Sequence, residues 1–198
     1  WPRPSYRGPR QELAKLFAKW DRSHRLRLVR ARHSPVWRRS QITAVAKDKL
    51  RDRSITDRRG PNGEEDRCDD GSRAMGSGAQ FCDLFLRPLE KLLLASSDLE
   101  DFYHIFIVSL ERAISNALGK EVPLRDFLGT RAHALFMEEK WHSLEEHVLA
   151  CFATLPMGDH LAVGVAVTAH IRVLKRIGLC SDATLIRNRV PMPRQGVF

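Results

Sequence analysis

The chain has 198 residues, of which 43% are hydrophobic, and it carries a net charge of +9 with a pI of about 9.9. This length and apolar content suit one domain or slightly more, with enough apolar side chains for a core. No apolar run is long enough to span a bilayer and no signal-peptide pattern is present, so we expect an intracellular protein of the cytoplasm or nucleus that is not secreted. The basic excess favours a polyanion as partner, nucleic acid or an anionic membrane surface, although a basic protein without such a partner has the same pI.

The cysteines are widely and irregularly spaced, and none belongs to a Cys-x-x-Cys pair: Cys68, Cys82, Cys151 and Cys180. This pattern predicts reduced thiols and no zinc site. The sequence begins at Trp1 and closes on residues 194–198 without a helix stop or a polar tail. We therefore expect a piece of a longer protein.

The N-terminal part is expected to form a helix and a basic hairpin. Apolar residues at helical spacing predict a helix over residues 11–20: Leu13, Leu16, Phe17 and Trp20. Residues 25–29 and 41–46 alternate polar and apolar side chains as strands do, and residues 54–56 are the expected returning strand of the hairpin. Such a hairpin either binds phosphate or is a solvated edge protected by its charge, and charge alone favours the second.

The central part is expected to be a loop followed by short elements. Residues 60–78 have no period and predict a loop, whose acidic groups (64–66, Asp69 and Asp70) lack calcium-loop spacing and are better explained as solvated acids. Residues 79–86 have helical spacing, and residues 92–97 predict an apolar strand. Ser109 is the expected N-cap of the next helix.

The C-terminal part is expected to be helical. Two helices are predicted within residues 124–149, where His142 and His147 do not share a helical face and are expected to be boundary residues rather than metal ligands. Residues 155–158 predict a turn that leads into an apolar helix over 161–177, with Gly178 just past its end.

Residues 96–104, Ser-Ser-Asp-Leu-Glu-Asp-Phe-Tyr-His, place two carboxylates after the expected apolar strand. Asp98 and Asp101 are costly at a buried strand end unless a partner or a metal neutralises them. The same residues also suit an acidic first turn of a helix that begins near Ser97. The pattern alone leaves both interpretations open.

The order Asp-x-x-Asp-x-Tyr after an apolar strand resembles the first catalytic block of reverse transcriptases, the RNA-directed DNA polymerases. On that resemblance, Asp98 is the catalytic, metal-binding aspartate, and Leu99 is counted with it among the metal-binding positions. Asp101, Phe102 and Tyr103 are implied at the nucleotide substrate, with Tyr103 under the sugar. Phe102 is larger than the residue that the family often keeps at its position.

A second block lies upstream. The run Arg53-x-x-x-Asp57-x-Arg59-x-x-Asn62 is similar to the fingers block of retroelement polymerases, in which a basic hairpin ends in Asp-x-Arg-x-x-Asn. The similarity implies that Arg53 binds the triphosphate of the incoming nucleotide together with a lysine. Either Lys47 or Lys49 fills that role.

A third block lies downstream. Phe152-x-x-Leu155-Pro156-Met157-Gly158 is similar to the Leu-Pro-x-Gly loop of the family, which implies that Met157 and Gly158 contact substrate. Met157 stands where glutamine is more familiar, and Asp159 stands where an aromatic or hydrophobic residue is commoner. The resemblance covers roughly residues 26–198, and the long link over 120–147 is typical of a divergent retroelement.

The resemblance implies transfer of deoxynucleotides from their triphosphates to a primer 3′-end on an RNA or DNA template, with two Mg²⁺ ions in the complete enzyme. The family's remaining catalytic acids form an x-x-Asp-Asp block after the Leu-Pro-x-Gly loop and its helix. No Asp-Asp pair follows Asp159 in these residues, and Asp182 is too early to replace it. A two-metal site needs carboxylates from two strands. We therefore expect these 198 residues alone to be inactive as a polymerase.

The expected fold class is α+β, with a small antiparallel sheet packed on helices. We expect an N-terminal loop and helix over residues 1–24, a fingers-like basic hairpin and loop over 25–90, and a truncated palm-like region over 91–198. No membrane partner is expected. The alternative function is a non-enzymatic basic nucleic-acid-binding module, or a decayed retroelement remnant, that binds nucleic acid through the basic region 25–59.

Overall fold

The computed structural model describes residues 9–49, 52–66, 75–96, 98–138, 147–188 and 190. The expectations for the entry loop before residue 9 and for Cys68, Asp69, Asp70 and His142 lie outside these residues. Contacts divide the chain into two compact units, with Trp1–Asp66 and Tyr103–Ala162 in unit 1 and Arg67–Phe102 and Val163–Phe198 in unit 2. The functional regions 1–24, 25–90 and 91–198 follow other boundaries and stay a prediction.

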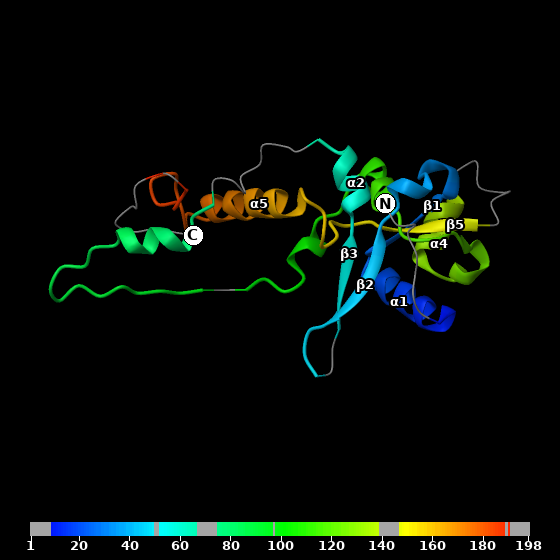
Figure 1. Ribbon diagram of the computed structural model, residues 1–198, viewed down its shortest axis with the longest axis horizontal. Helices are drawn as coiled ribbons and strands as arrows, with labels where there is room; N and C mark the ends of the chain where they lie inside the picture. The colour runs from blue at the N-terminus through cyan, green and yellow to red at the C-terminus, as the bar shows by residue number, and fades with distance from the viewer. Residues whose placement is uncertain are drawn as a thin grey trace. The chain divides into compact units, whose positions relative to one another are not determined.

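Unit 1 is built on a three-stranded antiparallel sheet in the order β1–β5–β4 (Figure 1). β1 spans Leu26–Arg30, β5 spans His147–Phe152 and β4 spans Val122–Pro123. β5 is the central strand and pairs with β1 in a register that sets Leu28 opposite Ala150. The expected α+β class, with a small antiparallel sheet packed against helices, is confirmed.

β5 replaces part of an expected helix. The two helices predicted within residues 124–149 include the first three residues of β5, and that part of the prediction is wrong. Val148, Ala150 and Phe152 face the larger core of unit 1, whereas Leu149 and Cys151 face a smaller apolar cluster. A strand that is buried on both faces shows no polar–apolar alternation, so its sequence cannot be told from a buried helix by periodicity.

Helices α1 (Arg10–Arg22) and α4 (Arg131–Glu138) cover the larger core. The predicted apolar face of α1 is confirmed, because Phe17 and Trp20 are buried there. The backbone N–H groups of Arg131 and Ala132 both donate to the Asp21 carboxylate at 2.8 Å. Asp21 therefore caps the start of α4 from the far end of α1, a long-range contact that joins the two helices.

The predicted hairpin is confirmed. β2 (Gln41–Ala46) and β3 (Asp52–Asp57) pair antiparallel, with Val45 opposite Arg53, and form a separate two-stranded sheet (Figure 1). The loop expected from residue 60 begins instead with the short helix α2, Arg59–Glu64.

Unit 1 also contains short helical segments. The predicted Ser109 cap is confirmed, since the Ser109 hydroxyl accepts the Arg112 N–H at 3.3 Å where α3 begins. The helix α3 and the 3₁₀ turns η1, η2 and η6 span, in that order, Leu110–Ser115, Ala31–His33, Val36–Arg38 and Leu124–Phe127.

Unit 2 contains helix α5 and a 3₁₀ helix, η4. α5 spans Ala162–Arg176 and confirms the helix predicted there, with Gly178 at a φ of 76° just after its end. η4 spans Gly78–Asp83 in place of the longer helix expected over 79–86. The Gln80 side chain ties η4 to the C-terminal part of the unit by donating to the Arg187 carbonyl at 2.8 Å.

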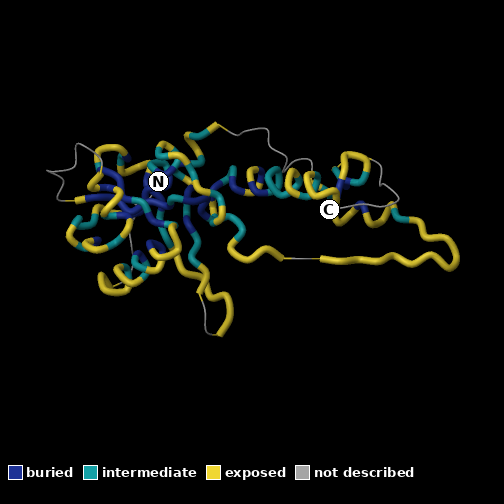
Figure 2. Tube along the Cα trace, turned by 180° about the vertical axis from the view of Figure 1, so that it is seen from behind, coloured by how far each residue is buried: buried dark blue, intermediate teal, exposed yellow. Residues whose placement is uncertain are grey.

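The strand predicted over residues 92–97 is not observed among its described residues, 92–96. These residues have no ladder partner within the described part of the chain, and Leu93 is 89% exposed. Figure 2 shows the segment as a long exposed stretch. Apolar side chains favour a strand only where neighbouring strands supply hydrogen bonds and a core. The predicted strand is therefore wrong for residues 92–96.

Two chemical expectations concern the whole chain. Cys82, Cys151 and Cys180 are free thiols, as predicted, and burial raises the pKa of Cys151 far above its ordinary value. Within the described ranges, no helix is both long enough and apolar enough to cross a membrane.

Candidate functional site

The Leu155–Gly158 turn is bound directly to the end of the hairpin. The backbone N–H of Thr56 on β3 donates to the Met157 carbonyl at 3.1 Å, and the Asn62 side chain donates to the Gly158 carbonyl at 2.9 Å. Gly158 has a φ of 107°, and a Cβ at that position would lie 1.9 Å from the Thr56 carbonyl oxygen. Only glycine permits this approach, so the turn and the run 53–62 form one contact.

A buried arginine lies behind this contact. The Arg58 side chain is completely buried and donates to the Ser115 carbonyl and to Glu65 Oε1, each at 2.7 Å, and also to the Asn116 side chain. Burial lowers the pKa of Arg58, while the charges of Asp159 and Glu65 act to raise it. Arg58 is therefore a buried cation, because an arginine side chain is not deprotonated in proteins.

A second arginine, Arg112 on α3, joins the two acids of the cluster. It forms ion pairs with Glu65 Oε2, at 2.7 Å, and with Asp159 Oδ2. Burial acts to lower the pKa of Arg112, but its bonds to Asp159 and Glu65 outweigh burial and the pKa is raised. Asp159 also accepts the backbone N–H of Leu161 at 2.9 Å, so it fixes the chain as it enters α5.

The same cluster contains a group that could hold a metal ion. Glu65, Asp159 and His160 each offer one ligand atom, and these atoms lie within 4.8 Å of one another. Both ring nitrogens of His160 are buried and have no hydrogen-bond partner among the described residues. Arg58 and Arg112 already balance the charge of the two carboxylates, so a divalent ion would compete with two guanidinium groups for the same oxygens.

The structure places the other residues predicted in unit 1 along the hairpin. Lys47, Lys49 and Arg53 are exposed on or next to β2 and β3, where a phosphate group can reach them. Asp57 accepts the Arg59 side chain at 2.7 Å, and this bond lowers the pKa of Asp57. The basic hairpin therefore presents exposed cations that have no ion pair among the described residues.

Residues 98–103, which resemble the first catalytic block of reverse transcriptases, lie mainly in unit 2. Asp98 and Leu99 are exposed, and Asp98 belongs to no group of three ligating side chains among the described residues. A magnesium site is therefore not assembled around Asp98 within the described part of the chain. Asp101 has a φ of 53°, in the left-handed region that Asp tolerates better than most residues.

The aromatic pair of that block follows in the 3₁₀ turn η5, Phe102–Ile105. The Phe102 ring contacts the His170 ring of α5 edge-on, with 5.6 Å between the ring centroids, a distance that is usual for such pairs. Phe102 therefore has a packing partner within unit 2. Tyr103 is half-buried and lies at the start of the second segment of unit 1.

The sequence did not predict the ion cluster of Arg58, Glu65, Arg112 and Asp159. Residues 64–66 were interpreted as solvated acids, which is wrong for Glu65, because that side chain is 19% exposed and contacts two arginines. Asp159 and His160 follow the Leu-Pro-Met-Gly turn directly, so their position in a functional block was the available signal. Their partners Arg58 and Arg112 come from distant segments, which no local pattern joins.

A search with protein-family models and a search of curated proteins both find no match to this chain.

Proposed function

We propose that this chain is the fingers and part of the palm of a reverse transcriptase from a divergent retroelement. The observation that carries the proposal is the direct contact between two of the three sequence blocks. Thr56 and Asn62 bond to the carbonyls of Met157 and Gly158, although about a hundred residues separate them in sequence. Two motifs that resemble substrate-binding blocks of one enzyme are thus neighbours in unit 1.

The charge of the hairpin supports the same proposal. Lys47, Lys49 and Arg53 are exposed cations on or next to the hairpin strands, and a nucleotide triphosphate is a dense anion. We propose that Arg53 and one of the two lysines bind the triphosphate. Tyr103 would contact the sugar, and Met157 and Gly158 would contact the base pair.

Asp98 is the proposed catalytic carboxylate. A bound Mg²⁺ would supply charge stabilisation at the transferring phosphate, and the complete enzyme would use two such ions. The family places an Asp-Asp block downstream of the Leu-Pro-x-Gly loop, and no Asp-Asp pair follows Asp159 in the 198 residues. We propose that these residues alone do not extend a primer, and that the site is completed by the additional block.

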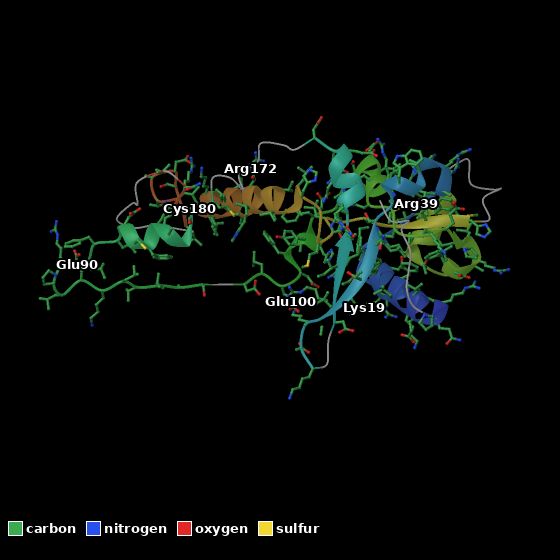
Figure 3. All side chains as sticks on the ribbon, viewed as in Figure 1. Lys19, Arg39, Glu90, Glu100, Arg172 and Cys180 are labelled. Carbon is green, nitrogen blue, oxygen red and sulfur yellow. The ribbon has the colours of Figure 1, made fainter. Side chains whose placement is uncertain are left out.

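The test is primer extension on an RNA template with two forms of the protein, the 198 residues alone and the same chain lengthened by the residues encoded downstream. Activity is expected only in the longer form and only with Mg²⁺. Asp98→Ala should abolish this activity, whereas Glu100→Ala, an exposed acid two residues away (Figure 3), should retain it. Equal activity of the two variants would refute the role of Asp98.

A second candidate function is a basic nucleic-acid-binding module without catalysis. It is favoured by the position of Asp98, which belongs to no group of three ligating side chains among the described residues. The two candidates differ in one result of the same assay. Binding of nucleic acid that weakens steeply with salt, without extension in the longer form, supports the module.

A further inference from the structure

The connection between β1 and β2 carries an exposed tryptophan on a rigid loop. Trp37 is 63% exposed, whereas Trp20 in the core is 6% exposed. An exposed indole costs free energy in water, because it leaves one of the largest apolar side chains unburied. Its place in this loop therefore requires an explanation other than packing.

The backbone of this loop, residues 31–39, is fixed by a buried arginine. Arg39 (labelled in Figure 3) donates to the Ser34 carbonyl at 2.9 Å and to the Ala31 carbonyl at 3.3 Å, so its side chain closes the loop on itself. It also forms an ion pair with Glu121 at 3.3 Å. The 3₁₀ turns η1 and η2 are thereby held together.

A second contact fixes Trp37 itself. Helix α2 packs against η2 so closely that a Cβ at Gly60 would lie 2.7 Å from the Trp37 carbonyl oxygen. The backbone beneath the indole is therefore held from two sides, while the ring remains in solvent. An aromatic side chain on a fixed backbone loses less conformational entropy when a flat ligand stacks on it than one on a mobile loop.

The sequence on both sides of Trp37 is basic, although Glu64 and Glu121 from other segments pair with Arg38 and Arg39. Between Asp21 and Asp48 the chain contains seven arginines and one lysine but neither Asp nor Glu. Within the loop, Arg32 and His33 are exposed and have no ion pair among the described residues, and Arg38 is 57% exposed although it contacts Glu64. A partner for this surface is therefore expected to be both anionic and aromatic.

Single-stranded nucleic acid has this chemistry. Its phosphates are attracted to the arginines, and its unpaired bases can stack on an indole, whereas the bases of a duplex already stack on one another. An acidic protein would satisfy the charges but would not require a flat exposed ring. We propose that Trp37, with Arg32, His33 and Arg38, forms a binding surface for single-stranded nucleic acid.

This surface, the Trp37 loop, includes no residue of the three sequence blocks. The inference rests on the proposed function only for the class of ligand, nucleic acid, and it requires no polymerase activity. It adds a position at which an unpaired strand would be held by unit 1.

The test is the fluorescence anisotropy of a labelled oligo(dT) of about 20 nucleotides, titrated with the full chain, since such a strand covers one to several sites of this kind. Trp37→Ala should raise the Kd by about tenfold, the usual loss when one base loses its stacking partner. Trp37→Phe keeps an aromatic face and should retain most of the affinity. A duplex of the same length should be bound equally by wild type and Trp37→Ala.

The cations are tested with a matched pair. Arg32→Ala should weaken binding and reduce the slope of log Kd against log salt by about one, since one phosphate contact is lost. Arg22→Ala removes an exposed arginine at the end of α1, outside the loop, and should leave both quantities unchanged. Equal effects of the two changes would show that the loop is not a specific binding site. Nucleic acid would then be attracted by the overall positive charge of the chain.

Further outcomes separate this inference from the proposed function. If Trp37→Ala binds oligo(dT) as tightly as wild type, or loses duplex and single-strand affinity equally, the Trp37 loop is not a stacking site, even if the longer chain extends primers. If binding depends on Trp37 and the longer chain extends no primer, the surface stands and the polymerase proposal fails. Capture of an acidic protein, with no binding of oligo(dT), would also overturn the inference.

Discussion

The sheet of unit 1 buries its apolar side chains, whereas an extended segment of unit 2 exposes them to solvent. In unit 1, residues such as Leu149 and Phe127 are almost completely buried by a sheet whose strands come from distant parts of the chain. In unit 2, Phe85 and Leu93 are each 89% exposed along an extended segment (Figure 2). The difference shows that apolar composition alone does not make a core, because burial requires partner strands at the right places.

The largest effect is expected from the ion cluster of unit 1. Arg58→Met should reduce the free energy of unfolding by about 3–5 kcal/mol, because Glu65 and Asn116 lose their buried partner. Urea unfolding followed by circular dichroism measures this change. The neighbouring Arg59→Met is the control, since that side chain is 66% exposed and should cost less than about 1 kcal/mol. Equal losses would show that Arg58 is not a structural centre.

The contrast between the units is tested directly by two leucines. Leu149→Ala, in the fully buried strand β5, should cost about 2–5 kcal/mol because it leaves a cavity. Leu93→Ala should change the free energy of unfolding by less than about 0.5 kcal/mol, since its side chain is in solvent. A large loss for Leu93→Ala would contradict the exposed state of this segment.

The contact between the two blocks is tested at Gly158. Gly158→Ala should cost about 2–3 kcal/mol, because the backbone is left-handed there and the new Cβ collides with Thr56. Gly178→Ala is the matched change, with a φ of 76° and nothing within 4 Å of the added atom, and should cost about 1 kcal/mol. Thermal unfolding of both variants distinguishes collision from backbone strain. Similar unfolding midpoints of the two variants would show that the Thr56 backbone moves to accommodate the new Cβ.

The smallest effect concerns acid stability. The bond from Arg59 holds the pKa of Asp57 below 3.8, so the ionised carboxylate stabilises the fold above that pH and the contribution disappears as pH falls through the lowered pKa. Asp57→Asn should therefore be less stable than wild type by less than about 1 kcal/mol near neutral pH. The difference should vanish at low pH in unfolding experiments. A difference that is constant with pH would refute the ion pair.

Local patterns predicted the elements whose stability is local. The face of α1, the hairpin β2–β3, the Ser109 cap and the helix before Gly178 all follow from spacing within a few residues. The first three residues of β5 were predicted as helix, because burial on both faces removes the period of a strand. The strand expected over 92–97 failed because a strand needs neighbours that local sequence does not supply.

The candidate site, too, was predicted from the sequence only in part. The sequence by itself determined the three blocks, the basic hairpin and the glycine that the turn at Gly158 requires. Only the tertiary structure decided that this turn contacts Thr56, that Glu65 is paired rather than solvated, and that Arg58 and Arg112 connect it to Asp159. Such contacts join residues tens of positions apart, and their energies depend on burial that exists only after the chain has folded.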